Sequence, residues 1–130
     1  NSCTPEQIGE IDGFIDEFLT KYVEYTSNKN KARYDNYQKL SQYLLEGSSL
    51  QERMQNALDG LKWVPDRKAQ VFSVEIHQRI PFLDGRILCD LTYIVDSYTN
   101  NNQPVREELT IQLILSPTEN GLKAETMFSN

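Results

Sequence analysis

The chain has 130 residues, of which 38% are hydrophobic and 25% are charged, and its formal net charge is −6. This length fits one domain that can bury a hydrophobic core, so we expect a single domain over residues 1–130. The acidic balance disfavours contacts with nucleic-acid phosphates and with anionic membrane surfaces. No segment approaches the ~20 consecutive apolar residues of a membrane span. Direct nucleic-acid binding is therefore not expected.

The two cysteines and the single histidine are too few for a zinc site, and we expect no metal and no other cofactor. Cys89 falls inside a strand pattern, which predicts a small buried apolar residue. A disulfide between Cys3 and Cys89 and a lipid attached to Cys3 both stay open. Because the chain begins with Asn1 rather than Met, we expect it to be a piece of a longer protein.

The first predicted element is a long amphipathic helix that begins at Thr4 and ends near residues 26–28. Thr4 can cap this helix, Pro5 suits its first position, and Gln7 completes a capping box with Thr4. Apolar residues then recur at helical spacing, which predicts that one face is buried. The residues of this stripe are Ile8, Ile11, Ile15, Phe18, Leu19 and Tyr22.

Two shorter helices are predicted next. The first covers residues 31–45 and is stopped by Gly47. Ser49 and Glu52 form a second capping box, which opens a helix that ends at Gly60. The segment from Trp63 to Asp66 is then expected to be a break in regular structure.

From Gln70 onward the hydrophobic period changes from that of a helix to that of a strand. Four strand patterns follow, and the turn-forming residues between them indicate hairpins. Their core-facing residues are expected to be Phe72, Val74, Ile76, Ile87, Cys89, Leu91, Tyr93, Val95, Leu109, Ile111, Leu113, Leu115, Leu122, Ala124 and Phe128. An apolar sheet face needs a cover, and the first helix has the matching stripe. We predict an α+β fold in which N-terminal helices pack on a curved four-stranded antiparallel sheet.

The opposite face of this sheet is expected to carry four apolar residues: Leu88, Ile94, Ile114 and Met127. Scattered exposed apolar residues are normal on a soluble protein. The spread of these four over three strands equally fits a contact surface for another subunit or partner. We predict association through this face.

The residue pattern contains no catalytic constellation. His77 is expected on the polar face of its strand beside Glu75, and a Ser-His-Asp site cannot be built without it. Asp12 and Asp16 lie one helical turn apart, which is usual for a solvated helix edge. We therefore predict that the protein is not an enzyme and has no catalytic residues. The alternative is a small-molecule-binding protein or an isomerase- or dehydratase-type enzyme, with a cavity between the first helix and the sheet.

The helical half of the chain resembles a known family. The residues that carry this likeness are Phe14-Ile15-x-x-Phe18-Leu19-x-x-Tyr22-Val23-x-Tyr25-Thr26, followed by Arg33, Tyr37, Leu40 and Tyr43-Leu44. They resemble the extracytoplasmic domains of Gram-positive conjugation proteins of the TcpC and TraM type. The resemblance covers most of the chain, although the Trp63-Val64-Pro65 segment has no counterpart in it. It implies a nuclear transport factor 2-like, or cystatin-like, roll.

The resemblance also implies a function as a structural component of a conjugative type IV secretion system, which transfers DNA. Such a component would be anchored by a membrane helix upstream of this chain, with its domain on the extracytoplasmic, cell-wall side of the cell membrane. Its partners would be other proteins of the transfer machinery and further copies of itself, with a trimer as one arrangement. A secreted or lipid-anchored binding module is the remaining alternative.

Overall fold

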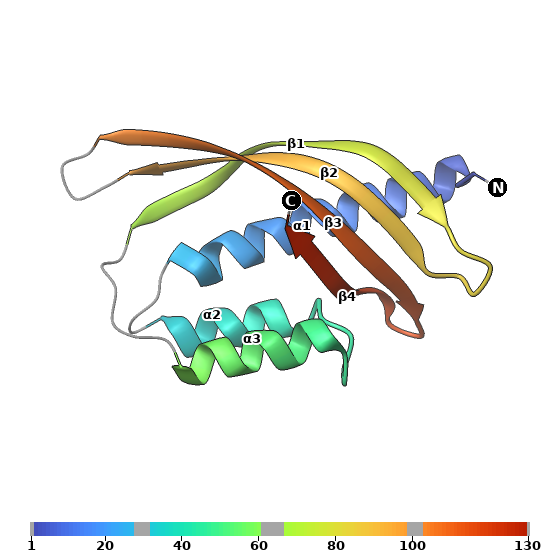
Figure 1. Cartoon of the computed structure of the whole chain (residues 1–130), viewed down its shortest axis with the longest axis horizontal. Helices are drawn as coiled ribbons and strands as arrows, with labels where there is room; N and C mark the ends of the chain where they lie inside the picture. The colour runs from blue at the N-terminus through green and yellow to red at the C-terminus, as the bar shows by residue number, and fades with distance from the viewer. Residues whose placement is uncertain (1, 28–31, 61–66, 99–102, 130) are drawn as a thin grey trace.

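The computed structural model describes residues 2–27, 32–60, 67–98 and 103–129 (Figure 1). Its elements, in chain order, are α1 (Pro5–Ser27), α2 (Arg33–Ser41), α3 (Ser49–Gly60), β1 (Lys68–Pro81), β2 (Ile87–Tyr98), β3 (Pro104–Thr118) and β4 (Gly121–Ser129). The strands form one antiparallel sheet in the order β1-β2-β3-β4. In Figure 1 the curved sheet arches over α1, and α2 and α3 lie together below it. The predicted α+β roll is confirmed.

The capping box at the start of α1 forms as predicted. The Thr4 amide donates to the Gln7 side-chain oxygen at 2.8 Å, and the Gln7 amide donates to the Thr4 hydroxyl at 3.2 Å. Farther along, Ile11, Ile15 and Leu19 are at most 1% exposed. The apolar stripe of α1 is therefore the centre of the core, where it lies under the concave face of the sheet.

The second helix is shorter than predicted, because it ends at Ser41 rather than near Leu45. The chain then runs along the edge of β4. The Ala124 amide donates to the Tyr43 carbonyl at 2.7 Å, and the Leu45 amide donates to the Ala124 carbonyl at 2.9 Å. These bonds occupy backbone groups of residues 43–45 that would otherwise continue the helix.

The cap of α3 lies one residue earlier than predicted. Ser48, not Ser49, accepts the capping bond, at 3.2 Å from the amide of Gln51. The side chain of Gln51, not that of Glu52, returns the bond by accepting from the Gly47 amide at 2.9 Å. The sequence Ser-Ser-Leu-Gln-Glu contains both capping patterns, and the structure uses the first.

Strands β2 and β3 alternate as predicted. Their pairing has no register shift from one end to the other. Their buried, core-facing residues are Ile87, Cys89, Leu91, Tyr93, Val95, Ile111, Leu113 and Leu115, and Leu109 is half-buried against the same core. The middle of the sheet therefore follows the sequence pattern closely.

The prediction that Phe72 faces the core is wrong. The pairing of β1 with β2 shifts register twice, which leaves Phe72 and His77 without partners in the ladder. Phe72 is 52% exposed, and the guanidinium of Arg106 lies 4.0 Å from the centre of its ring. Val74 and Ile76, in contrast, pack against the core as expected.

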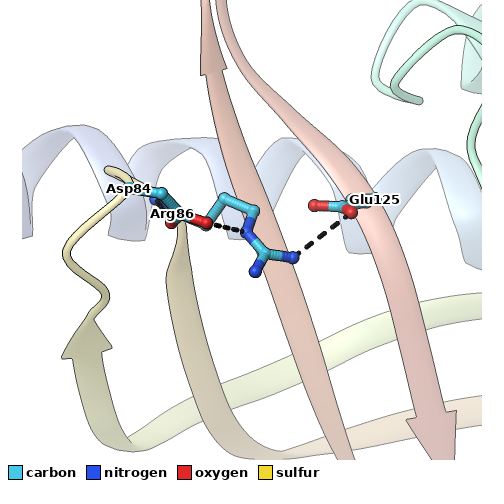
Figure 2. A network of polar contacts seen from close by, with 3 residues as sticks. All are labelled: Asp84, Arg86 and Glu125. Atoms are coloured by element: carbon cyan, nitrogen blue, oxygen red, sulfur yellow. Dashed lines mark hydrogen bonds and ion pairs between the residues drawn. The ribbon is translucent and has the colours of Figure 1, made fainter.

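The prediction that Met127 lies on the outer face is also wrong, as is the inward placement of Phe128. A register shift between β3 and β4 leaves Glu125 without a partner, and one extra residue reverses the facing of all that follow. Met127 is consequently 5% exposed in the core, whereas Phe128 is 50% exposed. The Glu125 carboxylate lies 3.4 Å from the guanidinium of Arg86, which also contacts Asp84 at 2.8 Å. Figure 2 shows this network of three side chains.

Two substitutions test whether Met127 lies in the core and Phe128 on the outer face of β4. Met127→Ala removes a buried side chain and is expected to lower the free energy of unfolding by about 2–4 kcal/mol. Phe128→Ala, one residue on, should lower it by less than ~1 kcal/mol because half of that ring is already in water. Urea denaturation of both variants measures the difference, and the opposite order would mean that the bulge at Glu125 is absent.

One half-buried ion pair joins α1 to β1. The guanidinium of Arg79 donates two bonds of 2.8 Å to the two carboxylate oxygens of Asp12. The Asp12 carboxylate raises the pKa of Arg79, mainly through these hydrogen bonds. Asp16, one turn along the helix, is exposed. The two aspartates therefore do not form a paired carboxylate site, since Asp12 is held by an arginine of the sheet.

Asp12→Asn is expected to destabilise the fold by about 1–2 kcal/mol, because it weakens a bidentate charge-assisted contact that is only partly screened by water. Asp16→Asn is the matched control and should leave the free energy of unfolding within ~0.5 kcal/mol. A double-mutant cycle with Arg79→Gln isolates the pair. A coupling energy near zero would show that the ion pair does not hold α1 in place.

Candidate functional site

The outer face of the sheet carries an apolar row, formed by Ile80, Leu88 and Ile114. Ile80 pairs with Leu88 across β1 and β2, and Leu88 pairs with Ile114 across β2 and β3. Leu88 and Ile114 are half-buried, and Ile80 is 41% exposed. Direct cross-strand neighbours on one face contact each other, so the three side chains form one continuous apolar strip. We call this strip the outer row.

The structure brings together two of the four predicted interface residues. Leu88 and Ile114 are adjacent in the outer row. Ile94 lies on the same face but pairs with Ser73 and Glu108, so its cross-strand neighbours are polar. Met127 is in the core. Ile80 was missed because the register shift next to His77 reverses the facing of the end of β1.

A polar chain of hydrogen bonds crosses the outer face beside Ile94. His77 Nε2 lies 2.8 Å from the Thr92 hydroxyl, which lies 3.2 Å from the Thr110 hydroxyl. The carboxylate of Glu75 is 3.9 Å from His77 Nδ1. His77 is exposed, as predicted, and its near neighbours, the Thr92 hydroxyl and the Glu75 carboxylate, lie on the surface of the sheet.

The concave side of the sheet contains two adjoining cavities of about 190 and 460 Å³, and both are lined by Tyr22, Tyr93 and Leu109. Burial raises the pKa values of Tyr22 and Tyr93, and for Tyr93 the nearby Tyr22 and Glu107 add to the effect. Glu107 lines the smaller cavity and lies 3.7 Å from Arg67. A cavity between the first helix and the sheet was one of the alternatives considered from the sequence. The wall that the two cavities share is aromatic and apolar, while polar side chains, among them Glu107 and Glu108, complete the linings.

A third cavity, of about 470 Å³, lies between α1 and the turn that joins β3 to β4. Gly9 and Gly13 form its floor on α1, where a side chain at either position would meet open space. The cationic residue in its lining, Lys123, is engaged, because its Nζ donates to the Gln42 carbonyl at 2.5 Å. This cavity is an open surface groove.

The part of the chain that the structure describes contains neither a cluster of metal-binding side chains nor a membrane-spanning helix. Across residues 2–27, 32–60, 67–98 and 103–129, no three histidine, cysteine or acidic residues come together as a metal site. Over the same residues, no helix combines the length and the apolar character needed to cross a bilayer.

The two cysteines are free thiols in the structure. Cys89 is fully buried, and this burial raises the pKa of its thiol to about 12. Cys3 is only partly buried, and its Sγ lies 3.8 Å from the carbonyl oxygen of Arg79, which is the cross-strand partner of Cys89. The thiol of Cys89 is therefore protonated and shielded at neutral pH.

This difference predicts two classes of thiol. At pH 8, Ellman's reagent should titrate Cys3 in the folded protein, whereas Cys89 should react only after unfolding in guanidinium chloride. Cys3→Ser should abolish the fast phase and leave the slow one. If neither thiol reacted after unfolding without a reductant, the two residues would be joined as a disulfide.

No protein-family model and no curated protein matches the chain. Solved structures do match it. An NTF2-like protein involved in plasmid conjugation has a TM-score of 0.60 at 11% identity over 91% of this chain. The match covers 46% of that structure, so this chain spans about half of its length.

Two further structures are similar to this chain over nearly their whole lengths. The intermembrane space region of the chloroplast protein ARC6 has a TM-score of 0.63 at 12% identity and covers 92% of both chains. A periplasmic fragment of TraM has a TM-score of 0.58 at 11% identity, over 94% of this chain and 96% of the fragment. At such identities the likeness concerns the fold. It confirms the roll that the resemblance implied, with a TraM fragment and a conjugation protein among its neighbours.

Proposed function

We propose that this domain is a non-enzymatic assembly component of a conjugative DNA-transfer apparatus, and that it associates through the outer row of its sheet. The outer row carries the proposal. It is an apolar strip across three strands, on a face that no helix of the described chain covers (Figure 1). An exposed contiguous apolar surface favours contact with another protein surface. The fold shared with the plasmid-conjugation protein and with the TraM fragment supports the choice of machinery.

The proposed location is the extracytoplasmic side of the cell membrane, with an anchor outside this chain. The periplasmic origin of the TraM fragment supports this choice. The proposed partners are other proteins of the transfer apparatus and further copies of the chain, with a trimer as one arrangement. Neither a cofactor nor direct contact with the transferred DNA is part of the proposal, since the net charge of −6 opposes binding to phosphates.

The cavity chemistry favours an assembly function over catalysis. An isomerase or dehydratase needs a general acid and a general base that titrate near neutral pH. Burial moves the pKa of Tyr93 away from that range, upward. The carboxylate of Glu107, which lines the smaller cavity together with Tyr93, is 47% exposed and lies 3.7 Å from Arg67.

Ile114→Asp is expected to abolish self-association, because it places a charge in the middle of the outer row. Leu83→Asp is the matched control: Leu83 is 99% exposed in the turn between β1 and β2, outside the paired strands, and the change should have no effect. Sedimentation velocity over a concentration series measures the masses of wild type and both variants. A monomeric wild type at all concentrations, or an oligomer unaffected by Ile114→Asp, would remove the proposed interface.

The conjugation assignment has its own test in the host. The reading frame that contains this chain should encode one membrane helix upstream and lie among transfer genes. Deleting the frame should reduce plasmid transfer, and complementation with the Ile114→Asp variant should fail to restore it. Normal transfer after deletion would contradict the assignment even if the domain oligomerises in solution.

A further inference from the structure

One carboxylate on the outer face of the sheet lacks a hydrogen-bond donor. Asp90 lies on β2, two residues from Leu88 of the outer row and on the same face. The residue is half-buried, and among the described residues nothing donates a hydrogen bond to its buried Oδ1. Its cross-strand neighbours, Gln78 on β1 and Gln112 on β3, carry amide donors, yet neither donates to this oxygen. Because an unpaired buried acceptor costs free energy, Asp90 favours a donor that approaches over the outer face.

Asp90 belongs to three successive rows in which β2 pairs with β3 on the outer face. In each row the residue on β2 and its neighbour on β3 are chemically complementary: apolar beside apolar, carboxylate beside amide, hydroxyl beside hydroxyl. All six residues are half-buried, and the register through them is unbroken. A surface that contains both members of each complementary pair can bind a copy of itself. The pairs are Leu88 with Ile114, Asp90 with Gln112, and Thr92 with Thr110.

We propose that a second copy of this chain docks face to face on these three rows, through a two-fold axis that runs parallel to β2 and β3 and between them. The inference rests on the proposed association through the outer row, and it adds the partner and the geometry. Such an axis places β2 of each copy over β3 of the other and keeps the rows aligned. Leu88 then contacts Ile114 of the second copy. Asp90 accepts a hydrogen bond from the amide of Gln112 of the second copy, and the symmetry forms this bond twice.

Other two-fold axes suit the same face less well. An axis along β2 would place Asp90 opposite Asp90 of the second copy, and like charges directly opposite each other repel. An axis across the strands at Leu88 would place Asp90 over Arg86, which lies two residues from Leu88 on the other side. Arg86 is already engaged by Asp84 at 2.8 Å and by Glu125 at 3.4 Å (Figure 2). Asp90 would therefore be a third carboxylate around one guanidinium.

The curvature of the sheet limits how much of the outer face two copies can share. The sheet arches over α1, so its outer face is convex (Figure 1). Two convex faces touch over few rows, and the strands of face-to-face sheets stay within about 30° of each other. The contact is therefore smaller than that of a permanent dimer, and we expect a reversible, concentration-dependent pair. In a small contact, a single donor–acceptor pair at the centre has a large effect on affinity.

Matched substitutions on the two sides of Asp90 test this pairing. Gln112→Glu should raise the dissociation constant of the dimer at least about tenfold, because it places a carboxylate against Asp90 of the second copy at two symmetric positions. Gln78→Glu makes the same charge change beside Asp90 of its own chain but away from the axis, and should alter the constant less than about threefold. Gln112→Lys keeps a donor and should dimerise at least as tightly as wild type. Sedimentation equilibrium measures all three, and circular dichroism verifies that they stay folded.

Cysteine cross-linking locates the axis. In a Cys3→Ser background, Leu88→Cys and Ile114→Cys each place one thiol on the outer face, while Cys89 stays buried. Sheets that pack face to face lie about 10 Å apart, a gap that a short bismaleimide spans. A mixture of the two variants should give several-fold more cross-linked dimer than either variant alone, because the axis brings position 88 over position 114.

Three results would overturn this inference and leave the proposed function standing. They are equal weakening by Gln112→Glu and Gln78→Glu, stronger cross-linking of either cysteine variant alone than of the mixture, and a trimer as the associated species. In each case, loss of association in Ile114→Asp would still support the outer row as an interface. A wild type that stays monomeric at all concentrations removes the outer-row interface itself, and this pairing with it.

Discussion

Burial of one stripe of α1 under the concave face of a sheet is the interaction on which the rest of the structure depends. Ile15 and Leu19 have no solvent contact, and neither do Leu91 and Leu113 on the two central strands. Because this helix covers only the inner face, the sheet must curve around it, and no described helix covers the outer face (Figure 1). The exposed outer row is a consequence of that one-sided arrangement.

The sequence predicts the parts of this fold that local chemistry decides. The capping box at Thr4 and the alternation of β2 and β3 are contained in the residues themselves, and both form as expected. The same holds for two members of the outer row, Leu88 and Ile114, because β2 and β3 pair without interruption. In these two strands, the side of the sheet on which a side chain lies follows from its position in the sequence alone.

The incorrect predictions about which residues face the core come from places where strand pairing inserts an extra residue. A β-bulge is a property of two strands together, and a hydrophobic pattern within one strand does not show it. Met127 and Phe128 are both apolar, so the sequence of β4 fits either facing, and only the unpaired Glu125 decides between them. The same reasoning explains why Phe72 is exposed and why Ile80 joins the outer row. The cap of α3 differs for a related reason, since Ser48 and Ser49 are chemically equal.

The bulges also determine which edge of the sheet stays available. In β1 they interrupt the free edge, while at β4 the segment 43–45 covers the edge instead. Among the described residues, segment 104–110 of β3 pairs only with β2, and its residues Arg106 to Glu108 are too polar for the sequence pattern to mark them as strand. Charged side chains commonly protect an exposed edge from pairing with other copies of the same chain.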